Sequence, residues 1–351
     1  MAQRSTQLSS SRLIHNSYLG ELLWQAYLFG RILHLPVRVL DAVQSTSFKF
    51  VDLKALRTLK NALPGEIDVY HCRSGFGAKS IKYANELGIA TVCEHTTAHP
   101  DFKEAEIEKT GKRLLKTEEL MKLDLESAQH ILVPSNWVMN TFKKYADNRK
   151  ITILTPPLNS EFRNFGLNQE SKNREIDVLF VGHVSKLKGI YRLYSIAINL
   201  APTIKISIAG TWDPKYSDLK DALNKRMNIS ILDYVEHGDV ANLMKSSKVF
   251  FFPSLIEGAA RVIDEATYSG CLVFATSASF ADDNQKAIYI DDLEDSEIVA
   301  KIEKFVNDSP EREKYALEAF DILQSRNNEY YPKLIELYSQ FRKRRNSELR
   351  G

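Results

Sequence analysis

The feature that most constrains the fold of this chain is a repeated alternation of short apolar segments with longer segments of helical periodicity. In the first half, the apolar segments that we interpret as strands are residues 36–40, 68–72, 89–94, 130–134 and 151–155. The helical patterns between them lie at residues 54–62, 78–87, 103–127 and 138–145. Alternation of this kind predicts βαβ units and a mostly parallel sheet, with ligand-binding loops at the carboxyl ends of the strands.

A polar stretch interrupts the pattern, and a second alternating series begins at residue 177. Its expected strands are residues 177–182, 204–210, 229–232, 249–253 and 272–276. Its expected helices are residues 190–200, 216–225, 240–245 and 261–269, followed by one or two helices over 310–343. We therefore predict an α/β chain with two Rossmann-like, doubly wound domains. Their bounds are residues 1–160 and 176–315, with a linker at 161–175 and C-terminal helices over 316–351 that pack back toward the first domain.

Composition narrows the functional classes. Lysine and arginine exceed aspartate and glutamate by only 47 to 45, so the chain lacks the basic field that drives sequence-independent nucleic-acid binding. Cys72, Cys93 and Cys271 are far apart in the sequence, which argues against a disulfide framework and fits a reducing cytoplasm. The chain shows neither the ~18-residue apolar run of a transmembrane helix nor a secretory signal, so we expect a cytoplasmic protein.

The two ends of the chain carry further signals. Residues 13–35 are rich in large apolar and aromatic side chains, interrupted by Glu21, Gln25 and Arg31. We interpret them as a packed first helix, and the alternative is a helix that also contacts a bilayer surface. The basic run at 342–345 is either a solvated helix end or an attraction site for anionic lipid or a polyanionic acceptor. No strand is evident before the first helix, so either the opening strand of the first domain is absent or the true start lies upstream.

The segment over residues 250–276 is the most informative. An apolar strand ends at Pro253, a loop carries Glu257 and Gly258, and a helix begins near Arg261. The helix amides and dipole form an anion site of the kind that binds phosphate. Glu265 lies eight positions after Glu257, and a carboxylate there can accept both hydroxyl protons of a ribose. The structural alternative is a capping acid followed by a solvated helix acid.

A second segment, residues 181–193, places a cation at a strand end in the same half. The strand ends at Gly182, and Lys188 and Gly189 come directly before a helix. A lysine at this position would neutralise a diphosphate and stabilise it as a leaving group. The alternative is an ordinary surface lysine.

Together these segments resemble the retaining GT-B glycosyltransferases of family 4, also called group 1. The resemblance rests on Gly182…Lys188-Gly189 and on Pro253-Ser254…Glu257-Gly258…Glu265-Ala266. Looser similarity extends over residues 60–320, through DVYHC, IATVCEHTTAH, ESAQHILVPSNWV and ITILTPPLNSEF. It implies the GT-B fold, with two Rossmann-like domains facing a cleft, acceptor-side first and nucleotide-sugar-binding second.

The resemblance also implies chemistry: transfer of a sugar from a nucleotide-diphosphate sugar to a sugar-containing acceptor, with retention and without a cofactor or obligatory metal. It assigns Lys188 to the diphosphate and Glu265 to the ribose, and it places Glu257 with residues 258–260 at the donor sugar and phosphates. His95 stands where the family often has a histidine near the reacting sugar, so His95 and Glu257 are the catalytic candidates. The candidate donor-binding residues are Gly182, His183, Lys188, Gly258, Ala259, Ala260, Arg261 and Glu265.

Some positions depart from the family pattern. His183 replaces the usual arginine, and Lys186 is a candidate to supply the lost charge. Arg261 is either a phosphate contact or an exposed residue of the first helical turn. In the first half, the glycine-rich turn after residue 72 is not a P-loop, because residue 73 is arginine and residue 78 is alanine. We expect that turn to face the cleft, so the acceptor-side candidates are Gly75, Phe76, Gly77 and His99, the last also an alternative to His95.

The favoured function is therefore a glycosyltransferase that acts by front-face transfer, with a role in surface polysaccharide biosynthesis. Its expected partners are a nucleotide-sugar donor, a glycan or glycolipid acceptor and the inner face of the plasma membrane through peripheral contact, but no nucleic acid. Two alternatives stay open. One is a nucleotide-sugar epimerase of the same fold, and the other is a non-catalytic nucleotide-sugar-binding subunit.

Overall fold

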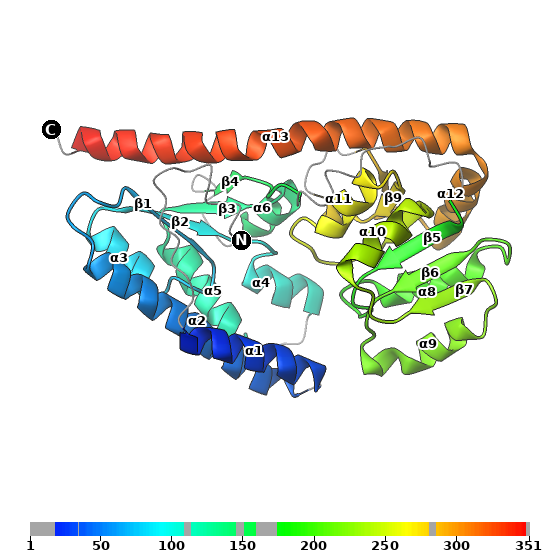
Figure 1. Ribbon diagram of the computed structural model, residues 1–351, viewed down its shortest axis with the longest axis horizontal. Helices are drawn as coiled ribbons and strands as arrows, with labels where there is room; N and C mark the ends of the chain where they lie inside the picture. The colour runs from blue at the N-terminus through cyan, green and yellow to red at the C-terminus, as the bar shows by residue number, and fades with distance from the viewer. Residues whose placement is uncertain are drawn as a thin grey trace.

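A computed structural model describes residues 18–33, 35–108, 114–144, 151–158, 174–280 and 286–348. The chain forms two α/β units, each with its own parallel sheet, and one long C-terminal helix runs along both (Figure 1). None of the helices described has an apolar stretch long enough to cross a membrane.

The first sheet is four-stranded and parallel. Its strands are β1 (Val69–Arg73), β2 (Ala90–Glu94), β3 (His130–Val133) and β4 (Ile151–Ile153), and each lies within two residues of an expected strand. Their spatial order follows the chain order, so these four strands contain no reversal of direction and no topological switch point. The doubly wound order that we expected of this domain is therefore not seen among them.

Two helices precede β1, α1 (Tyr18–Ile32) and α2 (Val37–Lys60). The expected strand at residues 36–40 is wrong, and the expected helix at 54–62 is only the last part of α2. Pro36 caps α2, and its fixed φ suits the start of a helix. Six of the seven buried positions of α2, all but Ser47, recur every three or four residues, which is the period of a helix and not of a strand: Asp41, Ser45, Phe48, Asp52, Ala55 and Leu59.

The two acids of this stripe cap the helices that pack beside α2. The carboxylate of Asp52 accepts hydrogen bonds from the amides of Lys79 and Ser80, both at 2.9 Å, at the start of α3 (Ser80–Glu86). Asp41 accepts from the amides of Lys116 and Thr117, at 2.8 and 3.0 Å, at the start of α5 (Lys116–Ser127). These bonds satisfy amides that have no partner within their own helices.

Between β2 and β3 the chain also forms a short α4 (Pro100–Phe102) and a π-helix (Lys103–Glu108), so the single helix expected over 103–127 is interrupted. Residues 109–113 lie outside the described part of the chain. α6 (Asn136–Phe142) follows β3 and is capped by Ser135, whose hydroxyl accepts a hydrogen bond from the amide of Val138.

The second sheet is six-stranded and parallel, in the order β10-β9-β8-β5-β6-β7. Its strands are β5 (Ile176–Val181), β6 (Ile206–Ala209), β7 (Ile229–Leu232), β8 (Ser247–Phe252), β9 (Leu272–Ala275) and β10 (Ile288–Tyr289). Its helices are α8 (Ile190–Asn199), α9 (Ser217–Asn224), α10 (His237–Lys245), α11 (Arg261–Tyr268) and α12 (Asp295–Asn307), with short 3₁₀ turns at Pro214–Tyr216 and Ser277–Ser279. Neither β10 nor α12 was expected from the sequence.

The order of this sheet reverses between β5 and β8, which makes it doubly wound with a switch point at that pair. β8 is central, and Phe250, Phe251 and Phe252 are all at least 99% buried, because helices cover both faces of a parallel sheet. The continuous apolar run that marked this strand in the sequence is a direct consequence of that position.

The last helix, α13 (Ser309–Glu348), connects the two units (Figure 1). Its first half packs on the second unit, where Leu323 contacts Tyr268 and Arg326 pairs with Asp264 of α11. Its second half covers the first sheet through Tyr330, Leu334 and Leu337. Asn327 lies between them and accepts a hydrogen bond from the amide of Leu158 at 3.0 Å. Most of the expected linker at 161–175 lies outside the described residues.

The capping role of α2 can be tested with Asp52→Ala. The change leaves the amides of Lys79 and Ser80 buried without a partner, so we expect the free energy of unfolding to fall by about 2 kcal/mol. Urea denaturation followed by circular dichroism measures this. Asp221→Ala, which removes an exposed acid of α9, is the control and should change the free energy by less than about 0.5 kcal/mol. Equal effects of the two variants would contradict the capping role.

Candidate active site

Two loops meet at the switch point of the second sheet. One follows β5 and spans residues 182–189, and the other follows β8 and spans residues 253–260. In open parallel sheets, ligands bind outside the carboxyl ends of the strands at the point where the strand order reverses. The two sequence segments that we singled out are therefore adjacent in space, although they are about 70 residues apart in the chain.

Gly189 allows the two loops to meet. It has a φ of 74°, which side chains disfavour, and it caps the start of α8. A Cβ atom at this position would lie 2.0 Å from the carbonyl oxygen of Pro253. The amide of Leu255 donates to the carbonyl of Leu187 at 2.8 Å, and the hydroxyl oxygen of Ser254 lies 3.1 Å from the same carbonyl oxygen. These contacts make the two loops one rigid rim.

Lys188 and Glu257, predicted from separate motifs, form an ion pair on this rim. The hydroxyl of Ser254 donates to the same carboxylate oxygen of Glu257 at 2.8 Å, and the Lys188 ammonium lies 5.2 Å from the centre of the Phe252 ring. Both charged side chains are only partly exposed. The pair holds an ammonium group at the strand ends, where an anionic ligand would compete with Glu257 for it.

Glu265 lies in α11 behind this rim, and its side chain is 6% exposed. Burial raises the pKa of its carboxyl, and the nearby charges of His237 and Arg261 act in the opposite direction. A buried carboxylate that faces two cationic or titratable neighbours is suited to accept hydrogen bonds from vicinal hydroxyls.

The remaining candidates of the second unit lie at its surface or at the start of α11. His183 is exposed, and its Nδ1 lies 2.9 Å from the hydroxyl of Thr211. Lys186 and Arg261 are also exposed, and Ala259 is half-buried. Ala260 caps α11, and its amide donates to the carbonyl of Ser279 at 2.9 Å, so the first turn of this helix is fixed in place.

Gly258 brings the second unit against the first. A Cβ atom on Gly258 would lie 1.7 Å from the carbonyl oxygen of Thr96, which follows β2. The hydroxyl of Ser135 donates to the carbonyl of Gly258 at 2.5 Å, and Ser135 follows β3. The strand ends of both sheets therefore converge at this glycine, and backbone packs directly against backbone.

His95 stands beside this contact but is enclosed by its own unit. Its Nε2 lies 3.0 Å from the carbonyl of Ala98, and its Nδ1 lies 2.8 Å from the hydroxyl of Ser74. Because a carbonyl can only accept, Nε2 carries the proton and Nδ1 accepts from Ser74. The ring is 1% exposed, and burial lowers the pKa of His95 to about 4. The imidazole is therefore neutral at physiological pH, with both nitrogens occupied.

His99, the alternative candidate, is 3% exposed and caps the short helix α4. Its Nδ1 accepts a hydrogen bond from the amide of Asp101 at 3.3 Å, and its own amide donates to the hydroxyl of Thr141 at 3.0 Å. Burial lowers the pKa of His99 as well. These contacts give His99 a structural role within the loop that follows β2.

The acceptor-side loop differs from our expectation. The amides of Gly75 and Gly77 donate to one carboxylate oxygen of Asp124, at 2.7 and 2.8 Å, and so point into the first unit instead of the cleft. The ring of Phe76 packs on Phe48 of α2, with ring centres 4.2 Å apart. A tight turn after β1 was expected, but the buried acid that holds it was not.

Sequence reasoning also missed Arg73, the last residue of β1. Its side chain is exposed at the carboxyl end of the first sheet, and it donates to the hydroxyl of Thr96 at 3.2 Å. Arg73 thus places a cation next to the point where Gly258 approaches. Its position at a strand end was the signal that could have identified it.

One group of side chains among the described residues has the composition of a metal site: Cys72, Cys93 and Asp124, whose ligand atoms lie within 4.8 Å of one another. The two cysteines face each other on β1 and β2. One oxygen of Asp124 holds the Gly75–Gly77 turn, and its other oxygen is buried without a hydrogen-bond partner. The group lies beneath the turn, apart from the switch-point loops.

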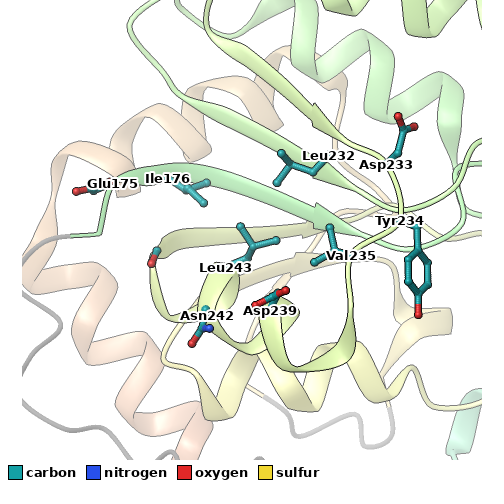
Figure 2. A pocket seen from close by; sticks show the side chains of 10 residues that line it. Glu175, Ile176, Leu232, Asp233, Tyr234, Val235, Asp239, Asn242 and Leu243 are labelled. Atoms are coloured by element: carbon teal, nitrogen blue, oxygen red, sulfur yellow. The ribbon is translucent and has the colours of Figure 1, made fainter.

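Figure 2 shows a cavity of about 570 Å³ in the second unit. Its lining side chains come from the start of β5, the segment that follows β7, and α10: Glu175, Ile176, Leu232, Asp233, Tyr234, Val235, Asp239, Asn242, Leu243 and Ser246. None of them is a candidate from the sequence. This cavity therefore lies apart from the rim that holds Lys188 and Glu257.

The contact at Gly258 can be tested with Gly258→Ala. The added methyl group cannot fit against the Thr96 carbonyl, so the two units must separate. We expect small-angle X-ray scattering to show a larger radius of gyration for this variant than for the wild type. Gly238→Ala adds the same methyl group where the structure has open space and should leave the scattering unchanged. Identical profiles for all three proteins would contradict the contact.

Asp124 predicts a pH dependence. Burial raises the pKa of this carboxyl in the folded state to about 7, from 3.8 for an exposed aspartate. The stability that it contributes is therefore full below pH 4 and is lost as the pH rises toward 7. Relative to Asp124→Asn, the wild type should lose on the order of 2 to 4 kcal/mol of unfolding free energy over this range. The measurement is urea denaturation of both proteins at several pH values. If their unfolding free energies changed with pH in the same way, the raised pKa of Asp124 would be contradicted.

Part of the chain matches a known protein family. The model of the family "Glycosyl transferases group 1" matches residues 164–321. A curated human relative is named as a subunit of phosphatidylinositol N-acetylglucosaminyltransferase and is 23% identical over 255 residues, which are 70% of this chain and 50% of that protein. The chain thus spans about half the length of the curated relative that it matches.

Solved structures share the fold. The Anabaena protein HepE, solved in complex with UDP and glucose, has a TM-score of 0.59 and 14% identity, covering 81% of this chain and 82% of that one. Sucrose-phosphate synthase from Thermosynechococcus elongatus has a TM-score of 0.65 and 14% identity, covering 84% and 78%. Residues 164–321 therefore match the model of the group 1 glycosyltransferases, and the chain has the GT-B fold of these solved structures.

Proposed function

We propose that this chain transfers a sugar from a nucleotide-diphosphate sugar to a sugar-containing acceptor, with retention of configuration. The observation that carries the proposal is the contact between Lys188 and Glu257 at the switch point, within the segment that matches the group 1 family. A cation held by a carboxylate, at the strand ends of a doubly wound sheet, suits a diphosphate that leaves with negative charge.

The donor occupies the second unit in this proposal. The diphosphate binds Lys188 and the amides that open α11, and the ribose hydroxyls bind Glu265. Glu257, released from Lys188, then faces the donor sugar. HepE was solved in complex with UDP, so a uridine nucleotide is the first donor to test. The proposed reaction uses no cofactor and no obligatory metal.

The hydrogen bonds of the neutral His95 ring decide which group can take the proton from the acceptor hydroxyl. Its Nε2 proton is donated to Ala98, and its Nδ1 accepts from Ser74, so the imidazole is not available to remove a proton from the acceptor. We therefore assign this proton to the departing phosphate, in a front-face transfer. In this proposal His95 has a positioning role: it holds the backbone of Thr96 against Gly258, and it does not act as the base.

We propose that the acceptor is a glycan or glycolipid that enters from the first unit, past Arg73. The word phosphatidylinositol in the name of the human relative favours a glycolipid. A glycolipid acceptor fits a protein that works at the cytoplasmic face of a membrane. A role in surface polysaccharide biosynthesis is compatible with either type of acceptor.

A non-catalytic subunit is the second candidate, because His183 replaces an arginine of the family and the curated relative is one subunit of an enzyme. It predicts nucleotide binding without sugar transfer. The epimerase alternative instead predicts turnover of the donor in the absence of any acceptor. A single set of measurements separates the three.

The test is a thermal-shift and hydrolysis screen against UDP-, GDP-, ADP- and dTDP-sugars. We expect one nucleotide class to stabilise the wild type, and Lys188→Ala and Glu265→Ala to lower the affinity at least tenfold, about 1.4 kcal/mol. Donor hydrolysis should fall by about two orders of magnitude in Lys188→Ala, because the leaving group loses its cation. Lys225→Ala, which removes an exposed lysine after α9, is the matched control.

Two outcomes would contradict the donor site. One is the absence of any nucleotide effect on the wild type, and the other is an equal response of Lys188→Ala and Lys225→Ala. Binding without hydrolysis or transfer would select the non-catalytic subunit, and an epimerised donor would select the epimerase.

A further inference from the structure

The outward face of α1 is exposed and largely apolar, with Glu21 and Gln25 as polar side chains at its margin. Tyr18, Leu22, Phe29 and Leu33 follow one another at intervals of four, seven and four residues, so they share one side of the helix and its end. Tyr18 is 83% exposed and Phe29 is 61% exposed. A soluble helix normally presents polar side chains on this face.

The opposite face of α1 is already occupied by α2. The hydroxyl of Ser47 in α2 donates to the carbonyl of Gly20 at 2.9 Å, and a Cβ atom on Gly30 would meet the side chain of Leu40 at 2.9 Å. The two helices lie side by side at the edge of the first unit (Figure 1). α1 therefore presents large apolar side chains outward as well as toward α2, and among the described residues only the side that faces α2 is covered.

The apolar surface continues over the turn into α2. Leu35, Val37 and Val39 are 41 to 64% exposed. A groove between the two helices follows, and apart from Arg38 and Thr46 its lining is apolar: Leu23, Arg38, Val39, Ala42, Val43 and Thr46. We call the outward face of α1, this turn and this groove the α1–α2 surface.

Basic residues outnumber acidic residues around the α1–α2 surface. Residues 1–60 contain eight lysines and arginines but only three acids, although the whole chain has a formal charge of only +2. Two of those acids, Asp41 and Asp52, are buried as helix caps, and the third, Glu21, is exposed on α1, where it accepts a hydrogen bond from Gln25. The cations of α2 that remain at the surface include Lys49, Arg57 and Lys60, which lie eight and three residues apart on one side of the helix.

We propose that the α1–α2 surface docks on an anionic lipid bilayer, with α1 lying in the interface. The apolar side chains would enter the boundary between headgroups and acyl chains, and the cations of α2 would contact lipid phosphates. A second copy of this chain is a poorer occupant, because it would bring two cationic helices together. Residues 1–17 contain Arg4 and Arg12 but no acid, so they add to the same charge.

The basic run at 342–345 does not belong to this surface. Figure 1 shows the end of α13 and helix α1 at opposite edges of the first unit. Arg342 also lies 3.7 Å from a carboxylate oxygen of Asp68. Docking through α1 therefore does not require the end of α13 to contact lipid.

The docking proposal is argued from the exposed apolar side chains and the charges of the first unit. Its benefit for catalysis depends on the proposed function, in which the acceptor is a glycolipid. The first unit carries both the α1–α2 surface and Arg73. A bilayer that holds this unit would present lipid-linked acceptors to the unit through which we expect the acceptor to enter.

Co-sedimentation of the full chain with vesicles tests the proposal. We expect binding to phosphatidylcholine vesicles that contain 30% phosphatidylglycerol, and at least tenfold weaker binding to phosphatidylcholine alone. The double variant Leu22→Gln, Phe29→Gln should bind the anionic vesicles at least tenfold less than the wild type. Met227→Gln, which changes an exposed apolar side chain of the second unit, is the matched control and should bind normally.

The cations are tested in the same way. Lys49→Gln and Arg57→Gln should each reduce binding roughly fivefold, whereas Lys225→Gln on the second unit should not. The depth to which α1 enters the bilayer is measured by tryptophan fluorescence of the Phe29→Trp variant. Brominated lipids quench a tryptophan only when it enters the bilayer. Fluorescence of this variant should be quenched more than that of the wild type, which retains its own tryptophans.

Absence of vesicle binding by the wild type would overturn the proposal, and so would equal binding by the Leu22/Phe29 and Met227 variants. A concentration-dependent dimer that only the α1 variants abolish would assign the surface to a second copy instead. The nucleotide-induced thermal shift of the α1 variants should match that of the wild type. Failure of docking and failure of the donor site are therefore measured separately.

Discussion

The arrangement of the two units depends on the contact of Gly258 with the Thr96 carbonyl, where no side chain fits. It joins a loop at the switch point of the second sheet to the loop that follows β2 of the first. Ser135 reinforces it from β3, and His95, adjacent to Thr96, is locked by Ser74 and Ala98. Because Glu257 directly precedes Gly258, this contact also fixes where the Lys188–Glu257 pair lies relative to the acceptor-side unit.

The site and the fold use buried carboxylates for different purposes. Asp41, Asp52 and Asp124 serve backbone amides within the first unit, so they position helices and a turn. Glu257 instead faces an ammonium at a strand end, and Glu265 lies in α11 with a raised pKa. A carboxylate that satisfies amides is already engaged, whereas one that balances a cation can exchange it for a ligand. On this ground we propose that Glu257 and Glu265, unlike Asp41, Asp52 and Asp124, take part in ligand binding.

Many of the strands and both loops of the candidate site could be predicted from the sequence, because each is marked by a pattern of neighbouring residues. Strand runs such as residues 249–253 were visible, since a doubly covered strand must be apolar throughout. The loops around Lys188 and Glu257 were visible because their residue types and spacing resemble the pattern of a known family. The helix that begins at Val37 was misread, because a short β-branched run hides a helical stripe. The role of Asp124 depends on contacts between distant segments, which no local pattern reveals, whereas Arg73 could have been identified from its position at a strand end.

The central claim is that the rim formed by the loops after β5 and β8 binds a nucleoside diphosphate. A crystal structure of the chain with UDP would test it most directly. We expect diphosphate oxygens within hydrogen-bond distance of Lys188 Nζ, with Glu257 displaced from the ammonium and the ribose near Glu265. A nucleotide bound instead in the cavity beneath α10, with the Lys188–Glu257 pair intact, would contradict it.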